Sequence, residues 1–180
     1  MRESEIKREL KPLLVESFGV QEKDVIFGKT TDLIVKIGKN KADWYYFEVK
    51  STDKDKRKNK KAYFGATSSG QLLEALQHPN HYYFILVSQE ANNIKYGIVT
   101  PNEIESYLTG YYLRADFNIP ETEIQKACCD KSLFQSRCNS LSKGHEIVSL
   151  SPKSQPNYDK IRRMTEIIEK FKTEINNESI

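Results

Sequence analysis

The sequence predicts an α/β protein with a mixed central β-sheet flanked by helices. Three observations along the chain lead to this fold class. Residues 4–18 place apolar side chains three and four positions apart, as on one face of a helix. Residues 30–50 contain two apolar runs around a glycine-containing turn, which indicates a β-hairpin. Residues 82–100 contain a continuous apolar run and a returning strand, and such a mixture of helices and strands is typical of layered α/β folds.

The first part of the chain is predicted to run from a helix into the hairpin. Gly19 is a suitable end for the helix, and Pro12 either kinks it or marks a later start. A short strand is expected at 24–27. The hairpin then pairs the apolar run in 30–38 with the strand 43–50 across a Gly-Lys-Asn-Lys turn.

A strongly basic segment follows the hairpin. Residues 50–61, KSTDKDKRKNKK, hold seven Lys or Arg residues and two Asp residues, a local charge of +5. The segment contains no apolar residue, so we predict a solvated loop. Beyond it, Ser68 or Ser69 is a suitable N-cap for a helix that opens at Gln71 and carries a leucine stripe.

The middle of the chain is predicted to complete the sheet. The run YYFILVS at 82–88 is expected to form a central strand that is buried on both faces. Residues 95–100 pair with it across a short turn. Thr100 can then cap a new helix, with Pro101 at its first position and Glu103 completing a capping box.

We divide the chain into a core, residues 1–108, and an extension, residues 109–180, that belongs to the same domain. Residues 109–155 carry no clear pattern and are left unassigned. The end of the chain predicts an amphipathic helix over 157–175 with a stripe of Ile161, Met164, Ile168, Phe171 and Ile175. This helix either packs back on the domain or contacts a second copy of the chain.

Composition excludes some classes of protein. No apolar run approaches the roughly 18 residues that span a bilayer, and the charged start MRESEIKREL is not a secretory signal. The three cysteines are expected to be reduced thiols in the cytoplasm. A zinc site with His145 is disfavoured because Cys128 and Cys129 are adjacent. The net charge of +3 says little about partners, so the distribution of charge matters more.

The segment YFEVKS, residues 46–51, places an acid and a lysine within an apolar strand. Glu48 and Lys50 lie two apart on an apolar strand, so both side chains point to the same face. The hairpin brings Asp32 beside them. Two adjacent carboxylates repel each other, and a divalent cation such as Mg²⁺ removes that penalty. A lysine beside the cation can position or activate an attacking water.

Asp32, a gap of 15 residues and then Glu48-Val49-Lys50 resemble the signature of the PD-(D/E)XK nuclease superfamily. The order of elements and the segment TSSGQLLEAL also agree with that family. The resemblance implies a restriction-endonuclease-like core with a C-terminal helical extension. It implies that Asp32, Glu48 and the carbonyl of Val49 hold Mg²⁺, with Mn²⁺ as a substitute, and that Lys50 positions the water.

The resemblance also assigns the supporting residues. Gln71 is similar to a glutamine that several branches place near the metal, and Thr31 stands where the family's proline would be. Many members carry a third carboxylate on the first helix, and Lys7 falls at that place here. Glu9 and Glu16 are the two alternatives for the missing acid.

We therefore expect a metal-dependent DNA endonuclease of the restriction, defence or repair type. RNA is an alternative substrate because the phosphodiester chemistry is the same. A homodimer is expected, since cleaving both strands needs two sites. The residues expected to contact DNA phosphates are Lys54, Lys56, Arg57, Lys58, Lys60, Lys61, Ser68 and Ser69. The rivals are a nuclease fold that binds DNA without cutting it and a subunit of a defence or repair assembly.

Simpler interpretations exist for each site residue. Asp32 could end a strand or pair with a surface lysine, and Gln71 could be an ordinary helix residue. Glu48 and Lys50 could be a charge pair on an edge strand, where charge prevents aggregation. The basic segment could be a plain solvated loop.

Overall fold

The computed structural model describes most of the chain up to Leu150. The described residues are 3–53, 61–68, 71, 74–75, 78, 80–90, 93–105, 107–109, 114–147, 149–150, 166 and 169–170. The main helices are α1 (Glu3–Phe18), α3 (Pro101–Glu105), α4 (Glu121–Ala127) and α5 (Lys131–Ser142), and 3-10 turns lie at Glu22–Asp24 and Lys41–Asp43. The strands are β1 (Val25–Phe27), β2 (Leu33–Val35), β3 (Tyr45–Asp53), β4 (Lys61–Ser68), β5 (Tyr82–Glu90), β6 (Asn93–Val99), β7 (Leu108–Thr109) and β8 (Arg114–Pro120).

A five-stranded sheet forms the centre of the molecule, in the order β1-β2-β3-β5-β6. β3 and β5 run parallel, and the other neighbours run antiparallel. The mixed sheet predicted from the sequence is therefore confirmed, as is a central position for β5. β3 lies between β2 and β5, so the interpretation of Glu48 and Lys50 as an edge-strand charge pair is wrong.

A second, three-stranded sheet was not predicted. It has the order β4-β8-β7 and is antiparallel. The predicted loop over 50–61 is too long at both ends, because β3 continues to Asp53 and β4 begins at Lys61. Residues 54–60 lie outside the described part of the chain. Pairing with β8, more than forty positions further along, makes the segment from Lys61 to Ser68 a strand.

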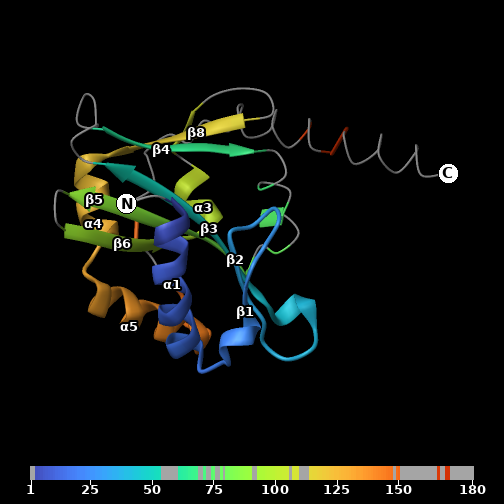
Figure 1. The fold of residues 1–180 in the computed structure, drawn as a ribbon. Helices are drawn as coiled ribbons and strands as arrows, with labels where there is room; N and C mark the ends of the chain where they lie inside the picture. Colours follow the sequence, from blue (N-terminus) through green and yellow to red (C-terminus); the bar gives the residue numbers. More distant parts are fainter. Residues whose placement is uncertain are drawn as a thin grey trace.

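Two apolar cores lie on the two faces of the five-stranded sheet. α1 and α5 cover one face, where Leu10, Phe47 and Phe134 are among the buried side chains. The other face carries Tyr46, Tyr82 and Phe84 and is covered by α3, α4 and part of the second sheet. Figure 1 shows this order, with α1 and α5 on one side of β3, β5 and β6 and with β4 and β8 on the other.

Local signals in the sequence fix several element ends. Gly19 follows α1 with φ of 61°, a backbone conformation that glycine adopts without strain. Pro12 lies inside α1, which continues through it. The capping box of α3 is confirmed, because the Thr100 N–H donates to Glu103 Oε2 at 2.8 Å and the Glu103 N–H donates to Thr100 Oγ1 at 3.2 Å.

The extension contains more regular structure than the sequence indicated. α4, α5 and the whole of β8 lie within residues 109–155, for which no element was predicted. α5 packs on α1 through Phe134, Cys138 and Leu141. The predicted helix over 157–175 lies outside the described residues except for positions 166, 169 and 170, which are helical.

The cysteines are free thiols, as expected, with Cys128 and Cys138 buried. Burial raises the pKa of Cys138 to about 12, so this thiol stays protonated at neutral pH. Within the part of the chain that the structure describes, no helix is long and apolar enough to cross a lipid bilayer.

Candidate functional site

The hairpin places Asp32 against the centre of β3. Leu33 pairs with Phe47, so the preceding residue, Asp32, lies level with Glu48. The Val49 N–H donates a hydrogen bond of 2.8 Å to Asp32 Oδ2. The N–H and C=O of one strand residue point to the same edge, so the Val49 carbonyl also faces the Asp32 side. The three groups that the sequence suggested as metal ligands thus gather at one edge of β3.

Glu48, Lys50 and Gln71 form a hydrogen-bonded group on one face of β3. Lys50 Nζ donates to Glu48 Oε1 at 2.8 Å and to Gln71 Oε1 at 3.3 Å, and Gln71 Nε2 donates to the same Glu48 oxygen. Only 2% of Glu48 and 8% of Lys50 is exposed. Charged groups are rarely buried this deeply unless they are paired, and this pair has a third partner that orients both members.

Lys7 of α1 reaches the same place from the other side of the hairpin. Its ammonium forms an ion pair with Asp32 Oδ1 and a second one, at 2.6 Å, with Glu3 one turn earlier in the helix. Burial lowers the pKa of Lys7, but its hydrogen bonds to Asp32 and Glu3 outweigh that effect and raise it above the usual value. Lys7 is therefore a permanent cation beside the two carboxylates.

Neither alternative for a third carboxylate lies at the site. Glu9 accepts a hydrogen bond from the Tyr96 hydroxyl on β6, at 3.2 Å, so it faces the opposite edge of the sheet from Asp32. Glu16 is exposed near the end of α1. In the described chain, α1 thus offers Lys7 to this site in place of an acid.

Burial perturbs the acidity of Glu48. Removal from water raises its pKa from the ordinary 4.5 to about 7, and the charge of Asp32 adds to the increase. Lys50 and, more weakly, Lys7 act in the opposite direction. A carboxyl group that titrates near neutral pH in a buried cluster is typical of a functional site.

Three buried oxygens at this site lack a regular hydrogen bond: Glu48 Oε2, Thr31 Oγ1 and Tyr82 Oη. The three side chains are neighbours. Burial raises the pKa of Tyr82, the charge of Glu48 raises it further, and the Thr31 side chain lowers it. Unsatisfied buried polar atoms are uncommon in folded proteins and call for an explanation at each position. Here they indicate a place that can accept a further polar or cationic partner.

The sequence reasoning did not select Thr31 or Tyr82 for this group. Thr31 was noted only as the residue that stands where the family's proline would be, and Tyr82 only as part of an apolar strand. The hydroxyl of Tyr82 comes near Glu48 because β3 and β5 pair in parallel, with Tyr46 opposite Tyr82. The sequence does not single out Tyr82, because a second tyrosine, Tyr83, follows it at the start of the same strand.

The donor set suits a hard divalent cation. It comprises two carboxylates, Asp32 and Glu48, and the Val49 carbonyl, and Mg²⁺ typically takes one or two carboxylates together with waters and substrate phosphate. Among the described residues, no group of three or more His, Cys, Asp or Glu side chains could hold a metal ion. The orphaned Glu48 Oε2 is the carboxylate oxygen of this site most in need of a cation.

Most of the residues expected to contact phosphate lie outside the described part of the chain: Lys54, Lys56, Arg57, Lys58, Lys60 and Ser69. Lys61 begins β4. Ser68 ends β4 and pairs with Arg114. The strand continues to Ser68 because β8 supplies a hydrogen-bonding partner.

His78 and His81 have structural roles. The ring of His78 stacks on Tyr46 at 4.0 Å between centroids, and that of His81 stacks on Tyr45 at 4.6 Å. Nδ1 of His81 lies 3.2 Å from the Trp44 carbonyl. Both histidines therefore fix the start of β3 and are not free for chemistry at Glu48.

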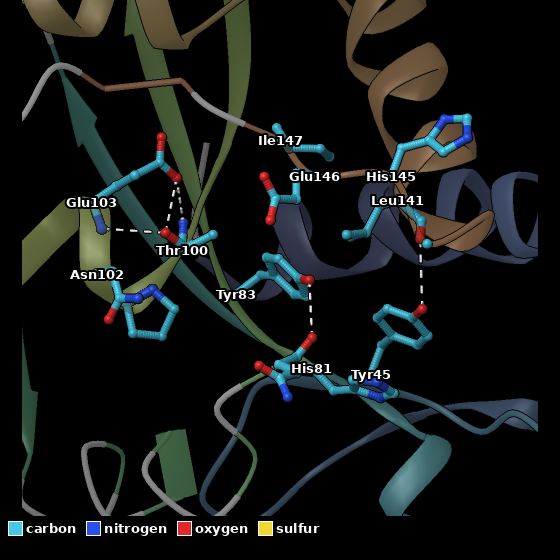
Figure 2. A pocket seen from close by; sticks show the side chains of 13 residues that line it. Tyr45, His81, Tyr83, Thr100, Asn102, Glu103, Leu141, His145, Glu146 and Ile147 are labelled. Carbon is cyan, nitrogen blue, oxygen red and sulfur yellow. Dashed lines mark hydrogen bonds between the residues drawn. The ribbon is translucent and has the colours of Figure 1, made fainter.

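A pocket of about 490 Å³ lies on the opposite face of the sheet, between β3, β5 and the segment after α5 (Figure 2). Figure 2 shows Tyr45 and Tyr83 facing into it, and their hydroxyls donate to the carbonyls of Leu141 at 3.5 Å and Asn80 at 3.1 Å. The best-placed acid is Glu103. It already accepts bonds from Thr100 at one oxygen and from the N–H groups of residues 149 and 150 at the other. Its carboxylate therefore links the start of α3 to residues 149 and 150.

Comparison with known proteins does not assign the chain to a family. No protein-family model matches the sequence, and no curated protein matches it significantly.

Proposed function

We propose that the protein is a Mg²⁺-dependent endonuclease that hydrolyses phosphodiester bonds of DNA at the Asp32–Glu48–Lys50 site. One observation carries this proposal. A buried carboxylate with an orphaned oxygen lies beside a second carboxylate and a buried lysine, on a strand in the middle of the sheet. Such a group is costly to fold, and it suits a site that binds a cation and a phosphate together.

Asp32, Glu48 and the Val49 carbonyl would hold the cation. When bound, Mg²⁺ neutralises charge on the scissile phosphate and makes a coordinated water more acidic. Lys50 would then direct its ammonium at the water or at the phosphate oxygen on which charge develops. Gln71 orients both Glu48 and Lys50, because its amide oxygen accepts from the lysine and its amide nitrogen donates to the carboxylate.

The finer fold belongs to the same proposal. The order α1, β1, β2, β3, β4, helical residues 71, 74 and 75, and then β5 parallel to β3 resembles the restriction-endonuclease-like core, apart from β4, which belongs to the second sheet. The two acids stand on β3 and immediately before β2, as the resemblance to the PD-(D/E)XK superfamily implies. This agreement in element order supports the nuclease proposal without identifying a substrate sequence.

DNA is the proposed substrate and a homodimer the proposed assembly. In the sequence, residues 54–60 between β3 and β4 include five Lys or Arg residues, which would supply contacts to the DNA phosphates. Phosphate contacts of this kind make affinity fall with salt. A symmetric dimer would bring one site to each strand of the duplex. The alternative assembly is a defence or repair complex in which this chain is one subunit.

A second candidate is a DNA-binding module that does not cut. The observation in its favour is that both oxygens of Asp32 already have partners, the Val49 N–H and the Lys7 ammonium. In that case Lys7 replaces the cation permanently. The two candidates differ in whether any metal supports cleavage.

Cleavage of supercoiled plasmid tests the proposal. The full chain would be incubated with Mg²⁺, Mn²⁺ or a chelator, and nicked and linear DNA would be followed on gels. Wild type should cut with either metal and not with the chelator, and Lys50→Met should cut at least about a hundredfold more slowly. Lys95→Met is the matched control, since Lys95 lies 4.0 Å from Glu90 on an edge strand, away from the site.

Two results would refute the proposal. Wild type could cut nothing with either metal, and retained DNA binding would then favour the non-cutting module. Alternatively, Lys50→Met could cut as fast as Lys95→Met, which would mean that the nuclease activity comes from another site or from a contaminant.

A further inference from the structure

The four carboxylate oxygens of the site have unequal partners. Asp32 Oδ1 takes the Lys7 ammonium, and Asp32 Oδ2 takes the Val49 N–H. Glu48 Oε1 accepts from both Lys50 and Gln71. Only Glu48 Oε2 is buried without a partner. The site therefore has one carboxylate oxygen prepared for a cation.

Lys7 is built into the site and is not a chance surface contact. Its side chain is 21% exposed and that of Asp32 is 14% exposed, so the pair is largely removed from solvent. Lys7 also acts electrostatically on Glu48. The helix holds the ammonium in place through Glu3, four residues earlier.

Charge and ligand count limit how many cations this site can hold. Asp32 and Glu48 face the ammonium groups of Lys7 and Lys50, so these four side chains are formally neutral before any metal binds, and Glu3 pairs with Lys7 from further out on α1. Two-metal sites place their ions about 3.5–4 Å apart and need carboxylate oxygens for both. Here the oxygen that would bind the second ion is the one that Lys7 occupies.

We propose that Lys7 takes the place of a second divalent cation, so that the site binds one cation per chain and uses the lysine ammonium as the other positive charge. This inference rests on the proposed metal-dependent function. It assigns Lys7 as a positioning residue that sets the number of cations and their affinity. Removing its charge should strengthen the first site, and replacing it by an acid should create a second one.

The size of the effect follows from Coulomb's law. Removing a unit positive charge a few ångströms from a doubly charged ion should tighten binding by about tenfold or more, even at the dielectric constant of water. Lys7→Glu would go further, because it adds a carboxylate next to Asp32 Oδ1. This variant should bind two ions where wild type binds one.

Counting Mn²⁺ ions tests the proposal without any cleavage assay. Free Mn²⁺ would be measured by electron paramagnetic resonance during titration of the full chain, and ions that Glu48→Gln still binds would be subtracted as surface binding. We expect one ion for wild type, one ion bound about tenfold more tightly for Lys7→Gln, and two for Lys7→Glu. Lys11→Gln is the control, because Lys11 lies one turn further along α1, 3.7 Å from the exposed Glu22, and this variant should match wild type.

The outcomes separate this inference from the function on which it rests. Two ions in wild type would overturn it and leave the nuclease proposal standing. The same would follow if Lys7→Gln and Lys7→Glu both bound the same number of Mn²⁺ ions as Lys11→Gln, with the same affinity. No specific Mn²⁺ binding by wild type would overturn both. A wild-type count of two overturns the inference by itself, so the test keeps a refuting outcome if a Lys7 variant fails to fold.

Discussion

Replacing Glu48 by glutamine should make the metal-free protein more stable at pH 8 and leave it unchanged in acid. Glutamine has the shape of a protonated glutamic acid and keeps an oxygen that can accept from Lys50. The substitution therefore removes the buried negative charge without leaving a cavity. Lys50 keeps its bond to Gln71 in either form.

The magnitude follows from the pKa of Glu48. Burial raises this pKa from 4.5 to about 7 in the folded protein, so between these values the folded state holds a proton that the unfolded chain has lost. Stability from this proton is fully present below pH 4.5 and is lost as the pH rises through 7. At about 1.4 kcal/mol for each tenfold change in acidity, wild type should lose about 3 kcal/mol over this window, and Glu48→Gln should not.

Urea denaturation at pH 4.5 and pH 8, with a chelator present, measures the difference. The two proteins should be about equally stable at pH 4.5, and the variant should be more stable at pH 8 by about 3 kcal/mol, or about 10 °C in Tm. Mg²⁺ should narrow the gap at pH 8 because it binds only the folded wild type. The control is Glu16→Gln, an exposed acid on α1 that should follow wild type. Equal pH dependence in Glu48→Gln and wild type would refute the reasoning.

Three further substitutions test the scaffold. Gly28→Ala would push a methyl group into the Thr31 carbonyl oxygen, so it should cost about 1–3 kcal/mol of unfolding free energy and also weaken Mn²⁺ binding by displacing Asp32. Gly97→Ala would place its Cβ 2.8 Å from the Ala127 carbonyl oxygen and should cost a similar amount while leaving Mn²⁺ binding intact. Glu103→Gln should lose about 2 kcal/mol, measured by urea denaturation, because its carboxylate accepts from Thr100 and from the backbone after α5.

The two glycine variants control for each other. Each crowds a backbone carbonyl, but only Gly28 lies in the turn that carries Asp32. If Mn²⁺ affinity falls equally in both, loss of stability explains the effect, and Asp32 is not held by that turn. If Glu103→Gln melts like wild type, its carboxylate is not a structural anchor and the pocket beside it would need another explanation.

Local patterns in the sequence were enough to predict that Asp32, Glu48 and Lys50 lie close together. β2 pairs with β3 as the predicted hairpin implies, and the alternation of side chains then puts Glu48 and Lys50 on one face, with Asp32 level with Glu48. The capping box at Thr100 and the end of α1 at Gly19 were also readable, because each depends on residues within one turn of helix.

Long-range pairing was not readable from the sequence. β4 and β8 stabilise each other across more than forty positions, and β4 has no apolar alternation that identifies a strand alone. β8 does alternate, with Ala115, Phe117 and Ile119 between polar residues, but this pattern does not show that its partner is β4. Tyr82 reaches Glu48 only through the parallel register of β3 and β5, and α4 and α5 are short helices with few apolar positions.

The central claim is that the buried carboxylate of Glu48 is present for chemistry and not for stability. The most direct test is plasmid cleavage by Glu48→Gln at pH 8 in saturating Mg²⁺, with the same preparation shown to be at least as stable as wild type without metal. The account predicts that cleavage falls at least about a hundredfold while the fold is retained. A variant that cuts DNA within a few-fold of wild type would contradict it.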